Sequence, residues 1–313
     1  RGCGRGCRFC TMAHRRMEHL PVETILADLD ANVTGGRRAV VAGSEDFFRY
    51  GASGGRVDFA ALAGLLDRMR RISEGAFLQL DHGNVFSVLQ YSDGELAELR
   101  RLLGRPGRAR TDYLWINMGL ESASGRLVKR VAAGKLGGAD PADWPEMVRE
   151  ACAKLLRAGF FPVFSVVLGL PGETPDDVAA TRSLVEQLTG VGAVVFPIFY
   201  EPVLPAGDAE AESAFALDDM RRDHLELYRG CYEVNFRRVP RLVADNQRAG
   251  GVSWAKRTLM QALGRVEVRD WRRNFRRLDR RLAGVAGASP AGTESESLHV
   301  AEAATSSGDL AGR

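Results

Sequence analysis

Three cysteines lie close together at the start of the chain, where Cys3, Cys7 and Cys10 follow a C-x3-C-x2-C spacing. Thiolates this close can bind three irons of a cubane iron–sulfur cluster and leave the fourth iron free for a substrate or cofactor. A structural zinc site would need a fourth ligand; His14 is near enough in sequence to supply it, but the matched ligand pairs typical of zinc modules are absent. The spacing therefore favours an iron–sulfur cluster and leaves structural zinc as the alternative.

The same run resembles the signature of the radical S-adenosylmethionine (radical SAM) superfamily, including an aromatic residue, Phe9, directly before the third cysteine. The resemblance implies a 4Fe-4S cluster on Cys3, Cys7 and Cys10, with the amino and carboxylate groups of SAM bound to the open iron. One electron from the cluster would cleave SAM to methionine and a 5′-deoxyadenosyl radical that abstracts a hydrogen atom. In such enzymes the cofactor carries the chemistry and the protein positions it.

The elements that must position this loop alternate between amphipathic helices and short apolar strands, the pattern of a parallel sheet covered by helices. Apolar residues at helical spacing and start signals, such as the capping box at 92–95 and Thr174-Pro175, predict where the helices lie. The predicted helices span 21–35, 57–72, 92–103, 146–158 and 175–189. Strands are expected at 38–43, 76–80, 113–120, 160–168 and 193–200, the first of them short and buried.

This alternation predicts an α/β fold with a parallel sheet and outer helices, and the resemblance implies six units in an open barrel: a partial (β/α)6 TIM-like barrel with a helical C-terminal extension. Because the chain starts at Arg1, inside the cysteine motif, the first strand and any upstream domain are expected to be missing. The strand at 38–43 would then be an exposed edge, which is an aggregation risk. In such barrels, residues at the carboxyl ends of the strands face the active site.

The first strand-end motif is Gly43-Ser44-Glu45, which follows the strand at 38–43. The superfamily carries a short Gly/Glu motif here whose backbone receives the amino group of SAM. The resemblance therefore implies SAM contacts from Gly43, Ser44 and Glu45, although a serine stands where the family usually has a second glycine. An ordinary polar loop is the alternative.

The second motif, Gly-Leu-Glu-Ser at 119–122, ends the strand at 113–120 and resembles the methylthiotransferase, elongator-type and cobalamin-associated branches. The resemblance implies that Glu121 contacts the amino group of SAM and that Ser122 begins the next helix. A buried carboxylate needs a partner, because an unpaired charge there is costly. The alternative partner is an arginine such as Arg126.

The third motif, Gly-Leu-Pro-Gly-Glu-Thr at 169–174, follows the strand at 160–168 and is specific for the same branches. The resemblance implies that this run, including Gly169 and Gly172, lines the adenine of SAM, since small residues let a backbone approach a flat ring closely. Glu173 is the residue that could serve only to hold the turn. A weaker match, at 205–208, follows the strand at 193–200.

The 313-residue chain has a formal net charge of +3, 45% hydrophobic residues and no apolar run long enough to span a membrane. Clustered cysteines without a secretory signal indicate a reducing, cytoplasmic location. We expect a radical SAM core at 1–208, a helical, arginine-rich region at 209–282 and a disordered tail at 283–313. The arginines at 237–281 are interpreted as a solvated helix face, with a nucleic-acid footprint as the alternative.

The leading hypothesis is a radical SAM enzyme of the cobalamin-associated branch that methylates or rearranges a small molecule, with cobalamin bound by an upstream domain. The alternatives are an RNA methylthiotransferase and a non-catalytic metal- or RNA-binding protein that kept the fold. The resemblance also implies a flavodoxin- or ferredoxin-like one-electron reductant. No membrane partner is expected, and no residue is identified that receives the substrate radical.

Overall fold

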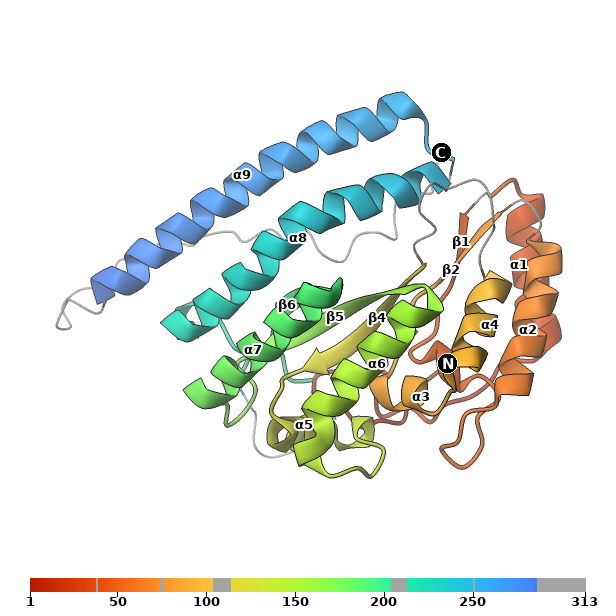
Figure 1. The fold of residues 1–313 in the computed structure, drawn as a ribbon, viewed down its shortest axis with the longest axis horizontal. Helices are drawn as coiled ribbons and strands as arrows, with labels where there is room; N and C mark the ends of the chain where they lie inside the picture. Colours follow the sequence, from red (N-terminus) through yellow and green to blue (C-terminus); the bar gives the residue numbers. More distant parts are fainter. Residues whose placement is uncertain (38, 74–75, 104–113, 204–212, 250, 286–313) are drawn as a thin grey trace.

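The computed structural model describes residues 1–37, 39–73, 76–103, 114–203, 213–249 and 251–285 (Figure 1). The strands are β1 (Ala39–Ala42), β2 (Phe77–Leu80), β3 (His82–Gly83), β4 (Leu114–Glu121), β5 (Phe160–Leu168) and β6 (Val194–Phe199). The α-helices are α1 (Val22–Thr34), α2 (Phe59–Ile72), α3 (Val85–Leu89), α4 (Asp93–Leu103), α5 (Gly125–Ala132), α6 (Trp144–Ala158), α7 (Pro175–Val191), α8 (Arg222–Ala249) and α9 (Trp254–Val285). Each predicted helix and strand is therefore present.

The described strands form two open parallel sheets, one of β1 and β2 and one in the order β3-β4-β5-β6. The sheets meet where β2 gives way to β3 at Asp81, whose carbonyl accepts the N–H of Asn117 at 3.0 Å. The Gln79 side chain adds a hydrogen bond to the Trp115 carbonyl of β4 at 2.5 Å. Strand order follows chain order, which confirms the predicted α/β fold with a parallel sheet and outer helices.

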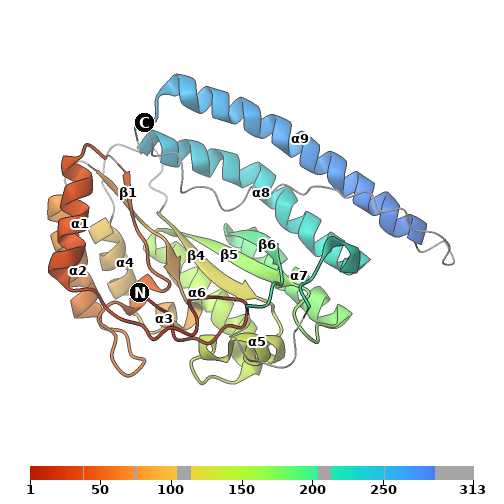
Figure 2. The ribbon, with the colours of Figure 1, turned by 180° about the vertical axis from the view of Figure 1, so that it is seen from behind.

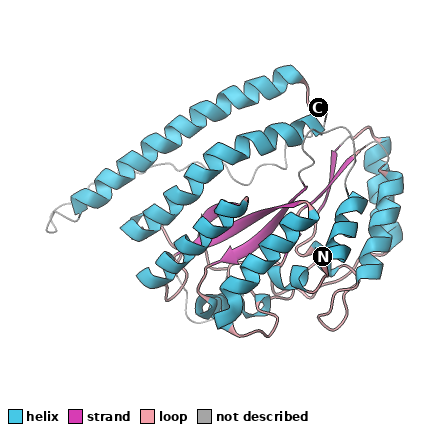
Figure 3. Ribbon diagram, in the orientation of Figure 1, coloured by secondary structure: helices cyan, strands magenta, loops and turns pink. Residues whose placement is uncertain are grey.

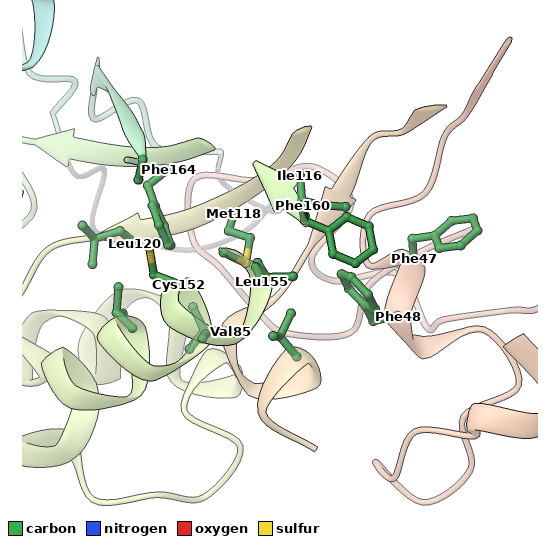
Figure 4. Packing of buried hydrophobic residues seen from close by; sticks show 14 of the residues in the cluster. Phe47, Phe48, Val85, Ile116, Met118, Leu120, Cys152, Leu155, Phe160 and Phe164 are labelled. Carbon is green, nitrogen blue, oxygen red and sulfur yellow. The ribbon is translucent and has the colours of Figure 1, made fainter. Parts of the chain in front are cut away.

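Helices α2, α4, α6 and α7 lie on the near side of the strands in the view of Figure 1, and α8 and α9 run along the top of the molecule (Figures 1 and 3). The main core forms between the strands and the first group of helices. Figure 4 shows Met118 and Leu120 of β4 and Phe164 of β5 beside Cys152 and Leu155 of α6. Strand β5 is buried along almost its whole length, as expected for a central parallel strand.

The edge of the sheet at β6 is covered by α8. Asn235 donates from Nδ2 to the carbonyl of Val195 at 2.8 Å, and Arg238 donates to the carbonyl of Ala193 at 2.8 Å. Leu242 of α8 packs in a small apolar cluster with residues of β5 and β6. Helix α9 then runs along α8, and the two helices form the C-terminal helical extension that the sequence predicts (Figure 1).

Some details differ from the predictions. Strand β1 is not buried: its residues alternate between exposed and partly buried, and Val41 is 60% exposed. The reason is that only one face of β1 packs against the core, through Val40 and Ala42, whereas Ala39 and Val41 lie on the other face. The helix after β4 begins at Gly125 rather than at Ser122, because the Ser122 hydroxyl instead bonds the side chain of Thr181 and accepts the N–H of Ser124.

Two predictions fall on residues outside the described ranges: the weak motif at 205–208 and the tail from residue 286 onward. Helix α9 reaches Val285, so the first three residues of the predicted tail are helical. None of the helices in the described part of the chain has an apolar stretch suited to crossing a bilayer.

Candidate active site

The cysteine loop is a compact turn folded back on itself. The N–H of Cys3 donates to the carbonyl of Arg15 at 3.1 Å, and the N–H of Gly6 donates to the carbonyl of Ala13 at 3.0 Å. Gly2 has a φ of 81°, in the left-handed region that only glycine adopts without cost. These contacts hold the three cysteines in one short arch.

This arch crosses the carboxyl ends of the strands, where Figure 2 shows it as the red segment running past the ends of β4 and β6. The N–H of Arg8 donates to the carbonyl of Val131 in α5 at 2.9 Å, and the carbonyl of Arg8 accepts the N–H of Val203 at 3.0 Å. The Phe9 ring lies edge-on to Tyr200, with centroids 6.3 Å apart. The loop therefore lies where a parallel α/β fold places its active site.

A buried arginine, Arg5, ties the cysteine loop to the rest of the fold. Arg5 donates to Asp46 at 3.0 Å, to the Ser87 hydroxyl at 2.7 Å and to the carbonyl of Gly134 at 2.8 Å. Asp46 is fully buried and also accepts from Ser87 at 2.6 Å. Burial raises the pKa of Asp46, and the Arg5 guanidinium opposes that rise. Because three separate segments meet on one side chain, Arg5 fixes the loop relative to the strands and helices.

The three thiols are free, and Cys7 is the most buried of them. Burial raises the pKa of Cys7 to about 11, the positive charge of Lys135 opposes the rise, and Glu121, Cys3 and Cys10 add to it. Burial also raises the pKa of Cys3. The thiols are thus close enough to influence one another's ionisation, and a cation lies within reach of Cys7.

That cation belongs to a buried ion pair at the end of β4. Lys135 forms an ion pair with Glu121, and their side chains are only 11% and 2% exposed. Burial alone would lower the pKa of Lys135, but the charges of Glu121, Cys7 and Cys3 outweigh it, so the pKa is raised. Glu121 has a φ of 62°, a left-handed conformation rare outside glycine, at a break in the register of β4 against β5. The predicted alternative, Arg126, bonds Asp177 instead.

The first strand-end motif lines a cavity of about 890 Å³. Its walls are formed by the motif, the cysteine segment and the end of β2. They comprise Arg1, Gly2, Met12, Arg15, Arg16, Glu18, Gly43, Ser44, Glu45, Asp81 and His82. The Asp81 carboxylate is 2.9 Å from Nδ1 of His82 and accepts from Asn117 at 3.2 Å. The hydrogen bond from His82 lowers the pKa of Asp81. The cavity is therefore polar and lies next to the cysteines.

The third motif forms a tight turn after β5 that is held by its own glutamate. Glu173 accepts the N–H of Gly169 at 2.9 Å and lies 2.9 Å from Nε2 of His224 in α8. Gly172 is exposed, and its carbonyl accepts from Arg126 at 3.2 Å. Neither glycine lines the cavity formed by the first motif. The two predicted halves of the SAM site thus lie at different strand ends.

The thiol set fits an iron–sulfur cluster by its chemistry: the loop brings three free thiols together and places a lysine close to the most buried of them. Within the described ranges, no three His, Cys, Asp or Glu side chains converge on a point where a single metal ion would sit. An iron–sulfur cluster does not require the three cysteines to converge on one point, since each cysteine binds its own iron. Cys3, Cys7 and Cys10 are therefore the residues that would hold it.

Sequence reasoning missed four residues of this site: Arg5, Asp46, Lys135 and His224. Lys135 lies in a glycine-containing stretch that carries no periodic signal, and His224 lies 51 residues from its partner. The one available signal was the buried glutamate at the end of β4, which requires a cation but does not say which. Long-range pairing, rather than local pattern, assembles the site.

Residues 1–185 match the family model described as the radical SAM superfamily. The chain is 26% identical over 269 residues to the ribosomal protein uS12 methylthiotransferase RimO of Trichlorobacter lovleyi, covering 85% of this chain and 55% of that protein. It is 24% identical over 238 residues to a tRNA-2-methylthio-N(6)-dimethylallyladenosine synthase of a Ruegeria species, covering 74% and 50%. The chain thus spans about half the length of these curated relatives.

A solved structure of the radical S-adenosylmethionine methyltransferase TsrM from Kitasatospora setae, with tryptophan and a SAM analogue bound, gives a TM-score of 0.44 at 16% identity. The match covers 63% of this chain and 34% of that one. This likeness is too weak to carry an argument.

Proposed function

Because the chain belongs to the radical SAM superfamily, an enzyme superfamily whose members use a 4Fe-4S cluster and SAM, we propose that it cleaves SAM reductively at a cluster held by Cys3, Cys7 and Cys10. The observation that carries the proposal is the position of the cysteine arch. It lies over the carboxyl ends of the strands, and Cys7 lies within electrostatic reach of the buried pair Lys135–Glu121.

When bound, the cluster supplies the electron that splits SAM and so generates the radical that starts the reaction. The residues of this chain hold and orient the partners. Arg5 holds the cysteine arch against the end of β1 through its buried contact to Asp46. Gly43, Ser44 and Glu45 are proposed to receive the amino group of SAM through their backbone. Glu121, which is paired with Lys135 in this structure, is proposed as a second contact to that group, and the turn beginning at Gly169 is proposed to take the adenine. Lys135 balances negative charge that gathers around the thiolates.

For the substrate, we propose a small molecule rather than RNA. The support is the cavity beside the cysteine segment, which charged and polar residues line and where Asn117 donates to Asp81 of the pair Asp81–His82. Many arginines of α8 and α9 are also engaged in ion pairs along the helices, such as Arg272 with Glu233, as a solvated face would be. A cytoplasmic flavodoxin- or ferredoxin-like protein is the proposed electron donor.

We also propose that the full-length enzyme uses cobalamin, because 119–122 and 169–174 resemble the cobalamin-associated branch. It would be bound outside this chain's described residues. The test is binding of cobalamin by the full-length gene product, measured by its visible absorption after desalting. A full-length protein that retains none would remove this subtype.

Transfer of a methylthio group is the second candidate. It is supported by the two curated relatives, whose matches extend over 85% and 74% of this chain. A methylthio product differs in mass from a methyl product by one sulfur atom, so mass spectrometry of the modified substrate separates the candidates. Binding of tRNA that weakens steeply with salt would favour the second.

The central experiment uses the full-length protein reconstituted anaerobically with iron and sulfide and then given dithionite and SAM. We expect release of 5′-deoxyadenosine and methionine from the wild type, and none from Cys7→Ala. Cys152→Ala is the matched control, because Cys152 is a buried cysteine of α6 and not part of the arch. Zinc in place of iron, or cleavage that survives Cys7→Ala, would overturn the proposal.

A further inference from the structure

His224, near the start of α8, is completely buried and contacts a motif 51 residues earlier in the chain. Its Nε2 atom lies 2.9 Å from Oε2 of Glu173, and its Nδ1 atom accepts the backbone N–H of Arg221 at 3.2 Å. A ring nitrogen that accepts a hydrogen bond carries no proton, so the proton of the neutral ring is on Nε2. His224 therefore donates to Glu173.

Glu173 connects this contact to the turn after β5. The same Oε2 atom that faces His224 also accepts the N–H of Gly169 at 2.9 Å. The Glu173 side chain is only 6% exposed, and a carboxylate at that depth depends on its donors. Gly169 has a φ of 76°, so its orientation is set by what the turn bonds to rather than by ordinary backbone preference.

The Phe215 ring lies against Gly169. A Cβ atom at position 169 would fall 2.1 Å from the Phe215 ring, which shows how closely the ring lies on the turn. The Phe215 and His224 rings meet edge to face with centroids 5.0 Å apart. His224 thus touches both side chains that fix Gly169: Glu173 by a hydrogen bond and Phe215 by ring packing.

We propose that His224 is a positioning residue for SAM binding, which acts through Glu173 to hold the Gly169 turn in the shape that takes the adenosine part of SAM. The inference rests on the proposed function, which assigns that turn to SAM. It also makes α8 part of the cofactor site. A helix that would otherwise be an appendage supplies a donor to the turn.

Two substitutions separate the roles of the ring's two nitrogens. His224→Asn keeps an acceptor near the Arg221 N–H but is too short to reach Glu173, whereas His224→Gln keeps a donor that can reach it. In the full-length, anaerobically reconstituted protein, we expect His224→Asn to bind SAM roughly 10- to 100-fold more weakly, because the buried Glu173 carboxylate loses a donor. His224→Gln should bind close to the wild type. SAM dissociation constants come from equilibrium dialysis.

A second readout does not depend on the cluster. In the iron-free protein, hydrogen exchange measured by mass spectrometry on the peptide around 168–174 should become faster in His224→Asn and return towards the wild-type rate in His224→Gln. Arg182→Gln is the matched control. It breaks the exposed ion pair of Arg182 with Glu226, which also joins α7 to α8, but leaves Glu173 untouched.

Unchanged SAM affinity in His224→Asn would overturn the inference, as would equal losses in both His224 variants, which would indicate packing rather than a donor. The proposed function fails on a different result: a wild-type protein that binds SAM and does not cleave it. The two failures are therefore distinguishable.

Discussion

The buried pair of Lys135 and Glu121 should respond strongly to removal of its cation. Lys135→Met keeps most of the side-chain volume but leaves the Glu121 carboxylate, 2% exposed, without its ammonium partner. Two unit charges in contact at an effective dielectric constant near 20 attract by about 4 kcal/mol. Removing one partner of a buried pair costs about 3–5 kcal/mol, because the other charge is left buried and uncompensated. We therefore expect Lys135→Met to lower the free energy of unfolding by about 3–5 kcal/mol.

A double-mutant cycle separates the charge effect from simple loss of packing. Lys135→Met combined with Glu121→Gln removes both charges, so the double variant should be more stable than Lys135→Met alone. The assay is urea unfolding of the full-length, iron-free protein followed by far-ultraviolet circular dichroism. If Lys135→Met loses less than about 1 kcal/mol, the value typical of an exposed pair, the pair is not a buried, coupled one. A double variant no more stable than the single one would refute the reasoning equally.

Three further outcomes follow from the geometry. Arg5→Met removes the cation paired with the fully buried Asp46, so the free energy of unfolding should fall by about 3 kcal/mol and the reconstituted iron content should drop; wild-type values for both would contradict the anchoring role. Because burial raises the pKa of Cys7 to about 11, its thiolate is scarce at neutral pH. Iodoacetamide should label Cys7 more slowly than the more exposed Cys10 in the folded, iron-free protein, with the Cys7 rate rising as pH approaches that value; equal rates before unfolding would count against this. Thr174→Ala removes the N-cap of α7 and should cost about 1 kcal/mol in urea unfolding, with Thr174→Ser as the variant that should restore it.

Helix positions could be predicted from the sequence because their signals are local. Thr174 is the N-cap of α7 as predicted, and the structure adds its capping box with Asp177. The predicted capping box at 92–95 is present as the reciprocal pair of Ser92 and Glu95. The strand-end rule also pointed to Glu121 and Gly169, whose roles in SAM binding stay predictions. The helix starts depend on residues only a few positions apart, so the local sequence determines them.

Pairings across the fold could not be predicted in this way. Nothing near Glu121 in sequence distinguishes Lys135 from Arg126 as its partner, and only the path of the chain after α5 decides between them. Burial of β1 was predicted from its apolar residues alone, and this was wrong because burial depends on what covers a strand. The Val41 side chain is 60% exposed despite its type.

The contacts of α8 with β6 leave the two edges of the sheet unequal in their ability to pair with another strand. Asn235 and Arg238 occupy the carbonyls of Val195 and Ala193, so an incoming strand would have to displace two side chains to pair there. Strand β1 pairs on one side only among the described strands. Any added strand, whether from another module or from a neighbouring molecule, would therefore join at β1 and extend the sheet from the side of the cavity, away from the C-terminal helices.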